Sequence, residues 1–392
     1  MASTSQSYDL FQLPASSQDI VAMVRRFAEE RVAPAAQAID TGGEFPSELY
    51  RQCHELGLIG LLVPEELGGA GESLVTMALI YEALAKASAT CSLVLSNSIE
   101  VAELLARHAS GSIRERYLDA ILTDGKIPCF ALTEPGAGSD AGGITTRAQL
   151  RRNRYVLNGR KIFITNGAVA DFFVVFAVTD PDARQSQRLT AFMVERDAAG
   201  FSVGTSEATM GVRGSPLTEL ALDNVEVSED RVLGGVGQGL PIALGGLIDA
   251  RIGAAAQCVG ICADALDRSL AYANDRVQFG QKIIEFQAMQ LMIADMAIRT
   301  EASRQLTLAA AVAQDRGSPE ASSLSAMCKT LASDSAMQNA LDAIQVHGGY
   351  GYCRDFGVER LARDAKAYQI FDGTNQIQRL NLAKGLARRK RR

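Results

Sequence analysis

Apolar residues recur with a helical period over the first third of the chain. Residues 18–37, 73–88 and 91–108 carry apolar side chains three or four positions apart, which is the spacing of one helix face. In the first run these positions are Ile20, Val21, Val24, Phe27 and Val32. The two later runs are apolar enough to be buried on more than one side. The pattern predicts a helical region over residues 16–125, broken by a glycine-rich loop at residues 58–71.

Residues 128–235 change to a pattern that is typical of β-structure. Residues 154–167 (RYVLNGRKIFITNG) read as a hairpin, in which Asn158-Gly159 is the turn between two strands. Further β-like runs follow with turn residues between them, over residues 171–180, 188–197 and 211–234. This region therefore predicts a β domain of about 100 residues.

Helical patterns return from about residue 240 in three long runs: residues 241–276, 284–314 and 322–349. Long helices in a row, each with an apolar face, are typical of an antiparallel four-helix bundle. The predicted fold is therefore an α+β multidomain chain with three parts: an N-terminal helical domain (1–127), a middle β domain (128–236) and a C-terminal helical bundle (237–392).

Composition excludes several classes of function. The 392 residues are 47% hydrophobic and 21% charged, with a net charge of −6, as in a globular protein with a large core. A generally acidic chain argues against nucleic acid as the main partner. The basic run RRKRR at the C-terminus is the exception, and such a run is most often a solvated tail.

Three features of the sequence indicate where in the cell the protein works: its cysteines, its N-terminus and its apolar runs. Seven scattered cysteines without a CxxC pair indicate reduced thiols, and only three histidines make a zinc site unexpected. The first 17 residues contain no Lys or Arg and no long apolar stretch, unlike a targeting peptide. No run of about 20 uninterrupted apolar residues is present, so we expect no membrane span and a cytoplasmic location.

Five short motifs carry the candidate chemistry. The first, TEPGAGSD, is a glycine-rich turn whose backbone N–H groups and hydroxyls could hold a phosphate or a flavin edge. Alone it reads as an ordinary loop, since it lacks the strand–GxGxxG–helix context of a dinucleotide site. The five motifs occur in this order: TEPGAGSD (133–140), KIFITNG (161–167), RVQFGQKIIEFQ (276–287), QVHGGYGY (345–352) and QIFDGTNQIQ (369–378).

In that order the motifs resemble those of the acyl-CoA dehydrogenase family, over residues 16–386. The resemblance implies FAD bound between the β domain and the bundle. Thr133 would bond the pyrimidine side of the flavin, Thr165 would sit beside N5, and Phe163 would pack on the ring where many members have Trp. The other cofactor residues that it implies in the same subunit are Phe130, Leu132, Ser139, Thr374 and Gln376.

The resemblance also implies that part of each cofactor site comes from a neighbouring subunit. Arg276 would pair with the pyrophosphate of the neighbour's FAD, and glycines would let the backbone approach it closely. The residues implied in this role are Arg276, Phe279, Gln287, Gln345, Gly348 and Gly349. In isolation, Arg276 would read as a surface ion pair and the two glycines as a helix cap. Sites of this kind need at least a dimer, and the family is usually a homotetramer.

Asp372 occupies the position at which the family normally has a Glu. By resemblance, this acid removes the α-proton of an acyl-CoA thioester, and a hydride leaves the β-carbon for flavin N5 to give the 2-enoyl thioester. A backbone N–H at the acid would help to hold the thioester oxygen, near Gly373. Asp is shorter than Glu by about 1.3–1.5 Å. In having Asp at this position, the chain resembles family members that act on alicyclic esters such as cyclohexanecarboxyl-CoA. This resemblance implies a substrate with a short, branched or alicyclic acyl group.

Two other positions bear on this assignment. Some relatives carry the base on the helix that contains GLIDARIG, directly before the Arg. Here that position is Ala250, so Arg251 is expected near the substrate, with Asp249 one step away. The helix that carries Glu100 lines the acyl pocket in the family, where an apolar residue would be expected. We favour a solvated helix face for Glu100; if it points inward, the substrate has a polar or reactive distal part.

Other functions stay open on the same fold. One is a flavin oxidase or monooxygenase similar to nitroalkane oxidase, which also uses an Asp. Another is a dehydrogenase of an acyl thioester on a carrier protein, or a non-catalytic member. For the leading hypothesis, CoA would lie over the β domain near Ser139, and the electrons would pass to an electron-transfer flavoprotein.

Overall fold

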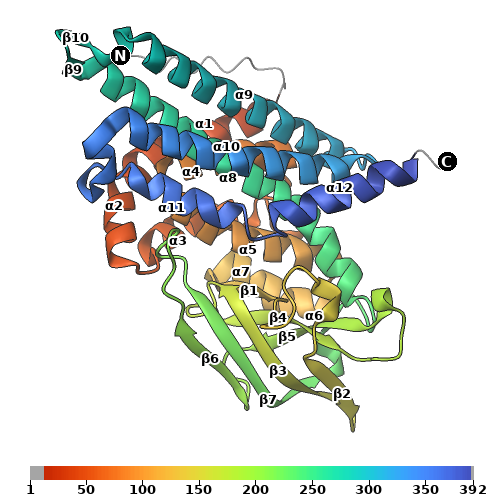
Figure 1. Cartoon of the computed structure of the whole chain (residues 1–392). Helices are drawn as coiled ribbons and strands as arrows, with labels where there is room; N and C mark the ends of the chain where they lie inside the picture. Colours follow the sequence, from red (N-terminus) through yellow and green to blue (C-terminus); the bar gives the residue numbers. More distant parts are fainter. Residues whose placement is uncertain (1–12, 390–392) are drawn as a thin grey trace.

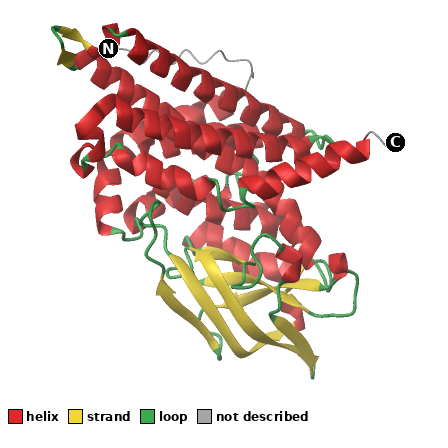
Figure 2. Cartoon of the chain, in the orientation of Figure 1, coloured by secondary structure: helices red, strands yellow, loops and turns green. Residues whose placement is uncertain are grey.

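The chain folds into a layer of long helices with a β-sheet packed at one end of it (Figures 1 and 2). The structure is a computed structural model that describes residues 13–389. Helical segments come first, the sheet follows, and helices form the rest of the chain, as the sequence pattern predicts. The last three residues of the basic tail and most of the N-terminal stretch examined for targeting signals lie outside the described residues.

The N-terminal part consists of helices that begin and end at residues with clear local signals. Ser73 and Ser88 cap the two long helices of this part, because their hydroxyls accept hydrogen bonds from the N–H groups of Thr76 and Cys91. The helices are α1 (Ala15–Phe27), α2 (Ala33–Gly42), α3 (Ser47–Glu55), α4 (Leu74–Ala87), α5 (Ala89–His108), α6 (Gly111–Ile113) and α7 (Asp119–Asp124). The predicted loop over residues 58–71 contains two short 3₁₀ turns.

The middle part is one eight-stranded sheet. Its strand order is β6-β7-β3-β2-β4-β5-β8, and β1 pairs with β4 in parallel. The strands are β1 (Pro128–Ala131), β2 (Arg147–Arg151), β3 (Arg154–Thr165), β4 (Phe172–Val178), β5 (Leu189–Glu195), β6 (Phe201–Ser206), β7 (Leu217–Ser228) and β8 (Val232–Leu233). β4 is buried along its whole length, so the sheet has a core of its own in addition to the one between the helices.

The prediction that Asn158-Gly159 forms a hairpin turn is wrong. β3 runs through both residues, and the true turn is Arg152-Asn153, where both residues have positive φ values (49° and 64°) and join β2 to β3. This is the two-residue geometry whose twist suits a hairpin. Gly159 instead marks a β-bulge against β7. A Cβ there would lie 2.3 Å from the Thr146 hydroxyl, so close approach of the backbone requires the glycine.

The C-terminal part is built on three long helices. They are α8 (Gly239–Asp275), α9 (Gln287–Asp315) and α10 (Ala321–His347), and the shorter α11 (Glu359–Tyr368) and α12 (Asn375–Arg389) follow. α8 packs against both α9 and α10, and α4 from the N-terminal part packs on α8 and α9. The two-stranded hairpin of β9 (Val277–Gln278) and β10 (Gln281–Lys282) projects from the end of α8 (Figure 1).

Two helices are long and apolar enough to cross a membrane by length and composition alone, α5 and α8. Most of each is buried inside the protein, 83% of the apolar window in α5 and 67% in α8. Both pack against other helices of the same layer, so their apolar character is that of core helices. All seven cysteines are free thiols, and only Cys353 is exposed.

Candidate active site

Asp372 and Gly373 form a left-handed turn between α11 and α12. Their φ values are 53° and 87°, a region that Asp and Gly tolerate better than most residues. The carbonyl oxygen of Asp372 accepts hydrogen bonds from Gln378 Nε2 at 2.9 Å and from Arg251 Nε at 3.2 Å. The carbonyl oxygen of Gly373 accepts from Lys329 Nζ at 3.0 Å. Three side chains from α8, α10 and α12 therefore hold this turn in place.

The carboxylate and the backbone N–H of Asp372 are free to bind a group from outside the described chain. Neither its carboxylate nor its backbone N–H hydrogen-bonds to any group within residues 13–389. Burial raises the pKa of Asp372 above its ordinary value, although the cations Lys329 and Arg251 oppose the rise. The turn thus presents a proton acceptor of increased basicity beside an unused N–H donor.

Lys329 is a residue of the site that the sequence reasoning missed. Its side chain is completely buried on α10, where Nζ also donates to Asn375 Oδ1 at 3.0 Å. Burial lowers the pKa of this ammonium to about 8, and the nearby charge of Asp372 works against the lowering. The sequence offered one signal for it, since Lys329 is the single Lys in the helical run of residues 322–349. A charge that is buried in such a helix is costly unless it has a partner, which indicates a specific contact.

Replacing Lys329 with Met is expected to move the pH dependence of the reaction. Loss of the ammonium removes a cation that lowers the pKa of Asp372, so that pKa should rise further. The acidic limb of kcat/KM against pH should shift upward by about one pH unit, because a higher pH is then needed to ionise the base.

The matched control for this experiment is Lys366→Met. Lys366 donates to Gln369 at 3.0 Å and makes no hydrogen bond to the Asp372-Gly373 turn. The control should leave the midpoint of the pH profile unchanged. If Lys329→Met lowers the plateau rate without moving the midpoint, Lys329 shapes the turn but does not tune the base.

Glu100 points into the protein, so our preference for a solvated helix face is wrong. α5 packs on α8 at Gly253, where a Cβ would lie 3.7 Å from Glu100 Oε1. Burial raises the pKa of Glu100 well above its ordinary value, and the charge of Asp372 raises it further. The reason for the error is local: Ile99, Val101 and Ala102 around Glu100 are all buried, so this part of α5 has no fully solvated face.

Asp249 does not offer an alternative base at the turn. Its carboxylate accepts from Gln314 Nε2 at 2.7 Å and pairs with Arg107 Nη1 at 3.1 Å. Those partners hold it on α8 away from the Asp372 turn, whereas Arg251 contacts that turn directly. Of the acids weighed in the sequence, Asp372 alone combines a free carboxylate with an unused N–H.

The residues expected along a flavin lie where the sheet meets the helices. β1 carries Phe130 and contacts α5, and Leu132 and Thr133 follow it directly. Phe163 has a φ of 57° at a bulge in β3, and the residue is 56% exposed. Thr165 is the last residue of the same strand. A bulge that turns a side chain outward is common next to binding sites. Ser139 is exposed in the turn after β1.

The motif residues Glu134 and Lys161 form a buried ion pair behind this surface. The two charged atoms are 2.8 Å apart, and Lys161 is completely buried. Glu134 also accepts from the N–H groups of Thr145 and Thr146 at 2.6 Å and 3.0 Å. Burial alone would raise the pKa of Glu134, but Lys161 and these donors bring it down to about 2. The pair fixes the TEPGAGSD turn onto β3.

Thr374 and Gln376 directly follow the Asp372-Gly373 turn, at the start of α12. The cofactor residues predicted for a neighbouring subunit lie at the opposite end of the bundle. Arg276 and Phe279 belong to the β9–β10 hairpin, which Figure 1 shows far from the sheet. Phe279, at the tip of this hairpin, is 95% exposed, and Arg276 lies over the Tyr350 ring. Gln345, Gly348 and Gly349 are exposed at the end of α10, and Gln287 is exposed at the start of α9. One chain alone does not bring these residues to Asp372.

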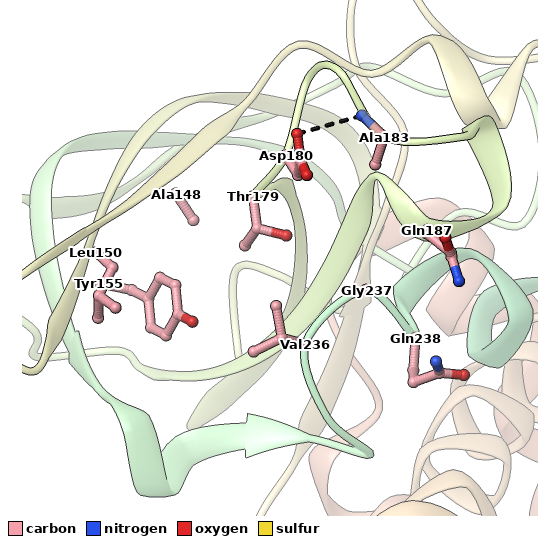
Figure 3. A pocket seen from close by; sticks show the side chains of 10 residues that line it. All are labelled: Ala148, Leu150, Tyr155, Thr179, Asp180, Ala183, Gln187, Val236, Gly237 and Gln238. Carbon is pink, nitrogen blue, oxygen red and sulfur yellow. Dashed lines mark hydrogen bonds between the residues drawn. The ribbon is translucent and has the colours of Figure 1, made fainter.

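A cavity lies elsewhere, on the outer part of the β domain (Figure 3). It has a volume of about 300 Å³ and is lined by residues that include Tyr155, Thr179, Asp180 and Gln238. It contains no residue of the five motifs. The candidate site is therefore assigned from its chemistry at Asp372 and not from cavity size.

Comparison with known families covers nearly the whole chain. Three family models match in order: acyl-CoA dehydrogenase N-terminal domain (residues 14–124), middle domain (129–225) and C-terminal domain (237–387). An acyl-CoA dehydrogenase of Bacillus subtilis is 44% identical over 93% of this chain and 96% of its own. A cyclohex-1-ene-1-carbonyl-CoA dehydrogenase of Geobacter metallireducens is 41% identical with the same coverage.

Solved structures agree with these sequence matches. Butyryl-CoA dehydrogenase from Megasphaera elsdenii has a TM-score of 0.92 and 36% identity, with 96% of this chain and 99% of the other covered. The prolyl acyl carrier protein oxidase AnaB has a TM-score of 0.91 and 31% identity, with 96% and 100% covered.

Proposed function

Because the chain belongs to the acyl-CoA dehydrogenase family, we propose that it dehydrogenates an acyl thioester whose α-carbon is branched or part of a ring. The observation that carries this proposal is the Asp372 turn. Its carboxylate and N–H are free, while its carbonyl oxygen is tied down by Arg251 and Gln378. Because the backbone of Asp372 is held in place and its side chain is short, its carboxylate can reach the substrate's α-carbon in only a narrow range of positions.

FAD is the cofactor of this enzyme, and the residues present fit it. The outward ring of Phe163 offers an aromatic face next to Thr165, and the turn after Thr133 has open space around Gly136 and Gly138. The buried Glu134–Lys161 pair holds that turn in shape. When bound, the oxidised flavin supplies the acceptor for the hydride that leaves the β-carbon of the substrate.

The protein's own groups account for the proton transfer. Asp372 accepts the α-proton, and its raised pKa makes it a stronger base than an exposed Asp. Its backbone N–H is available to the thioester oxygen, which gains negative charge as the proton leaves. Arg251 and Lys329 fix the turn, so that the carboxylate and the N–H keep their relative position during the reaction.

Two observations support a cyclic or branched acyl group. Asp372 has one methylene less than Glu, so a more distant α-carbon would be out of its reach. The Geobacter relative is named for a cyclic acyl-CoA. The similarity to a prolyl acyl carrier protein oxidase favours one alternative, in which the same thioester is presented by a carrier protein in place of CoA.

Anaerobic titration of the enzyme's flavin tests this proposal. Butyryl-CoA, isobutyryl-CoA, octanoyl-CoA and cyclohexanecarboxyl-CoA would each be mixed with the protein while the oxidised flavin absorbance is followed. We expect bleaching by the cyclic ester, by isobutyryl-CoA, or by both. Equal bleaching by straight chains would make Asp372 a tolerated variation. No bleaching by any CoA ester, together with bleaching by a carrier-bound ester, would favour the alternative.

We also propose that the enzyme is a homo-oligomer, with the homotetramer as the leading form. The cofactor residues at the β9–β10 end are too far from Asp372 to share its site within one chain (Figure 1). Large apolar side chains are exposed on the outer helices, as expected of a surface that pairs: Leu291, Ile298, Leu341, Leu380 and Leu386. A cytoplasmic location and electron delivery to an electron-transfer flavoprotein complete the proposal.

Co-expression of two inactive variants tests the shared site. Subunits with Arg276→Ala and subunits with Asp372→Ala should each be inactive alone. A mixed dimer would contain one intact site, with Asp372 from one subunit and Arg276 from the other, so about a quarter of the sites should regain activity. No recovery would place both residues in the site of one subunit.

A further inference from the structure

Glu100 is a partly buried acid without a counter-charge. It forms no hydrogen bond or ion pair with any residue in the described part of the chain. The charged groups that act on it are all carboxylates: Asp372, Glu103 and Asp249. Glu103 and Asp249 share Arg107, and Asp372 has Lys329 and Arg251 nearby, so the cations of this region already have partners. Glu100 is left without one.

Tyr81 is a second unpartnered group at the same place. It lies on α4 with its side chain completely buried, and its hydroxyl has no hydrogen-bond partner among residues 13–389. A Cβ on Gly253 would lie 2.9 Å from Tyr81 Cε2 and 3.7 Å from Glu100 Oε1. The ring edge and the carboxyl oxygen therefore flank one point on α8. Because Gly253 has no side chain, the Tyr81 ring can pack directly on the backbone of α8 at this point.

A purely aliphatic acyl group would not suit this arrangement. It would cover the partly exposed Glu100 carboxyl and leave both this carboxyl and the buried Tyr81 hydroxyl unpaired. Buried polar groups in folded proteins nearly always have partners. The electrostatic surroundings of Glu100 favour a positive group, because every charge that acts on it is negative. An ammonium would give Glu100 a counter-ion and a hydrogen-bond donor. It would lie on the side of Glu100 that is nearer to Asp372.

We propose that the acyl group of the natural substrate carries an amine, held as an ammonium by Glu100 beside the Tyr81 hydroxyl. This inference rests on the proposed dehydrogenation of a thioester with a branched or cyclic α-carbon. Asp372 remains the base, and Glu100 determines which acyl group is accepted. The substrate class is then a saturated nitrogen-containing ring carried on a thioester, with its nitrogen away from the α-carbon.

Matched thioesters test the proposal because they differ in one ring atom. Cyclohexanecarbonyl-CoA and piperidine-4-carbonyl-CoA have the same size and the same α-carbon, but only the second has a ring ammonium. Rates of anaerobic flavin reduction would be measured for both with the wild-type enzyme. We expect the piperidine ester to be favoured by about tenfold or more, the range of a hydrogen bond to a charged group.

Three variants separate a binding role from a general effect on the fold. Glu100→Leu should reverse the preference toward the cyclohexane ester, and Tyr81→Phe should weaken the preference for the amine several-fold. Glu115→Leu is the matched control, since Glu115 is exposed and is not among the groups that act on Glu100, and it should keep the wild-type preference. The FAD content of each variant reports whether the fold is intact.

The outcomes distinguish this inference from the function on which it rests. Reduction by the cyclohexane ester at a rate equal to or above that of the piperidine ester, in wild type and Glu100→Leu alike, overturns the amine and keeps the dehydrogenase. Failure of both esters, with FAD bound, counts against the cyclic substrate class itself. A preference for the piperidine ester that survives Glu100→Leu would remove Glu100 from the site of recognition.

Discussion

Asp372→Ala will lower kcat by about 10³-fold or more while FAD stays bound, because a positioned general base contributes on the order of 10²–10⁴-fold and the turn that carries it is otherwise unchanged. The carbonyl oxygens that Lys329, Arg251 and Gln378 hold belong to the backbone. Truncation of the side chain therefore removes the proton acceptor and leaves these contacts. The measurement is anaerobic flavin reduction with cyclohexanecarboxyl-CoA, alongside the absorbance of bound FAD.

Asp372→Glu is the companion variant, since it restores the longer acid. The added methylene moves the carboxylate by about 1.3–1.5 Å, and an ångström of misplacement can cost on the order of 100-fold in rate. We expect slower reduction by the ring ester and a relative gain for straight chains such as butyryl-CoA. Full activity of Asp372→Ala would sink the assignment of the base, whatever Asp372→Glu does.

Lys161→Met will destabilise the protein by about 3–5 kcal/mol, the usual cost of removing one partner from a buried ion pair. The change leaves the Glu134 carboxylate buried without its counter-charge, and it also removes the hydrogen bond from Lys161 Nζ to the Leu132 carbonyl oxygen. The free energy of unfolding in urea measures the loss, at one protein concentration and with FAD removed from all samples. Arg160→Ala is the control: its pair with Glu219 is exposed, so the loss should stay below about 1 kcal/mol.

A second substitution checks the mechanism of this loss. Adding Glu134→Gln to Lys161→Met removes the stranded charge, so part of the stability should return; no recovery would mean that the charge is not the cause. The pair also sets an acid limit. The pKa of Glu134 in the folded protein, about 2, lies below its ordinary value of 4.5. Its contribution is therefore complete above about pH 4.5 and is lost as the pH falls toward 2.

Some of the candidate site could be predicted because it depends on short-range pattern. Asp372, Gly373 and Thr374 are neighbours in the chain, and their turn is local, so the motif alone pointed to them. Lys329 is 43 positions away from Asp372, and nothing in the sequence relates them. Only the packing of α10 against the start of α12 brings the ammonium to the carbonyl of Gly373.

The sequence by itself determined the order of the three parts and indicated the candidate base, because helical periodicity, β alternation and contiguous motifs are written in neighbouring positions. Only the tertiary structure determined that Asn158-Gly159 is part of a strand and that the Glu100 side chain points into the protein. Asn-Gly favours a turn in isolation, but pairing of β3 with β7 keeps the strand running through it. Glu favours solvent in isolation, but α5 is covered by α8 at Gly253. In the first case contacts between distant segments outweigh a local preference worth about 1 kcal/mol. In the second they outweigh the larger cost of removing a carboxyl from water.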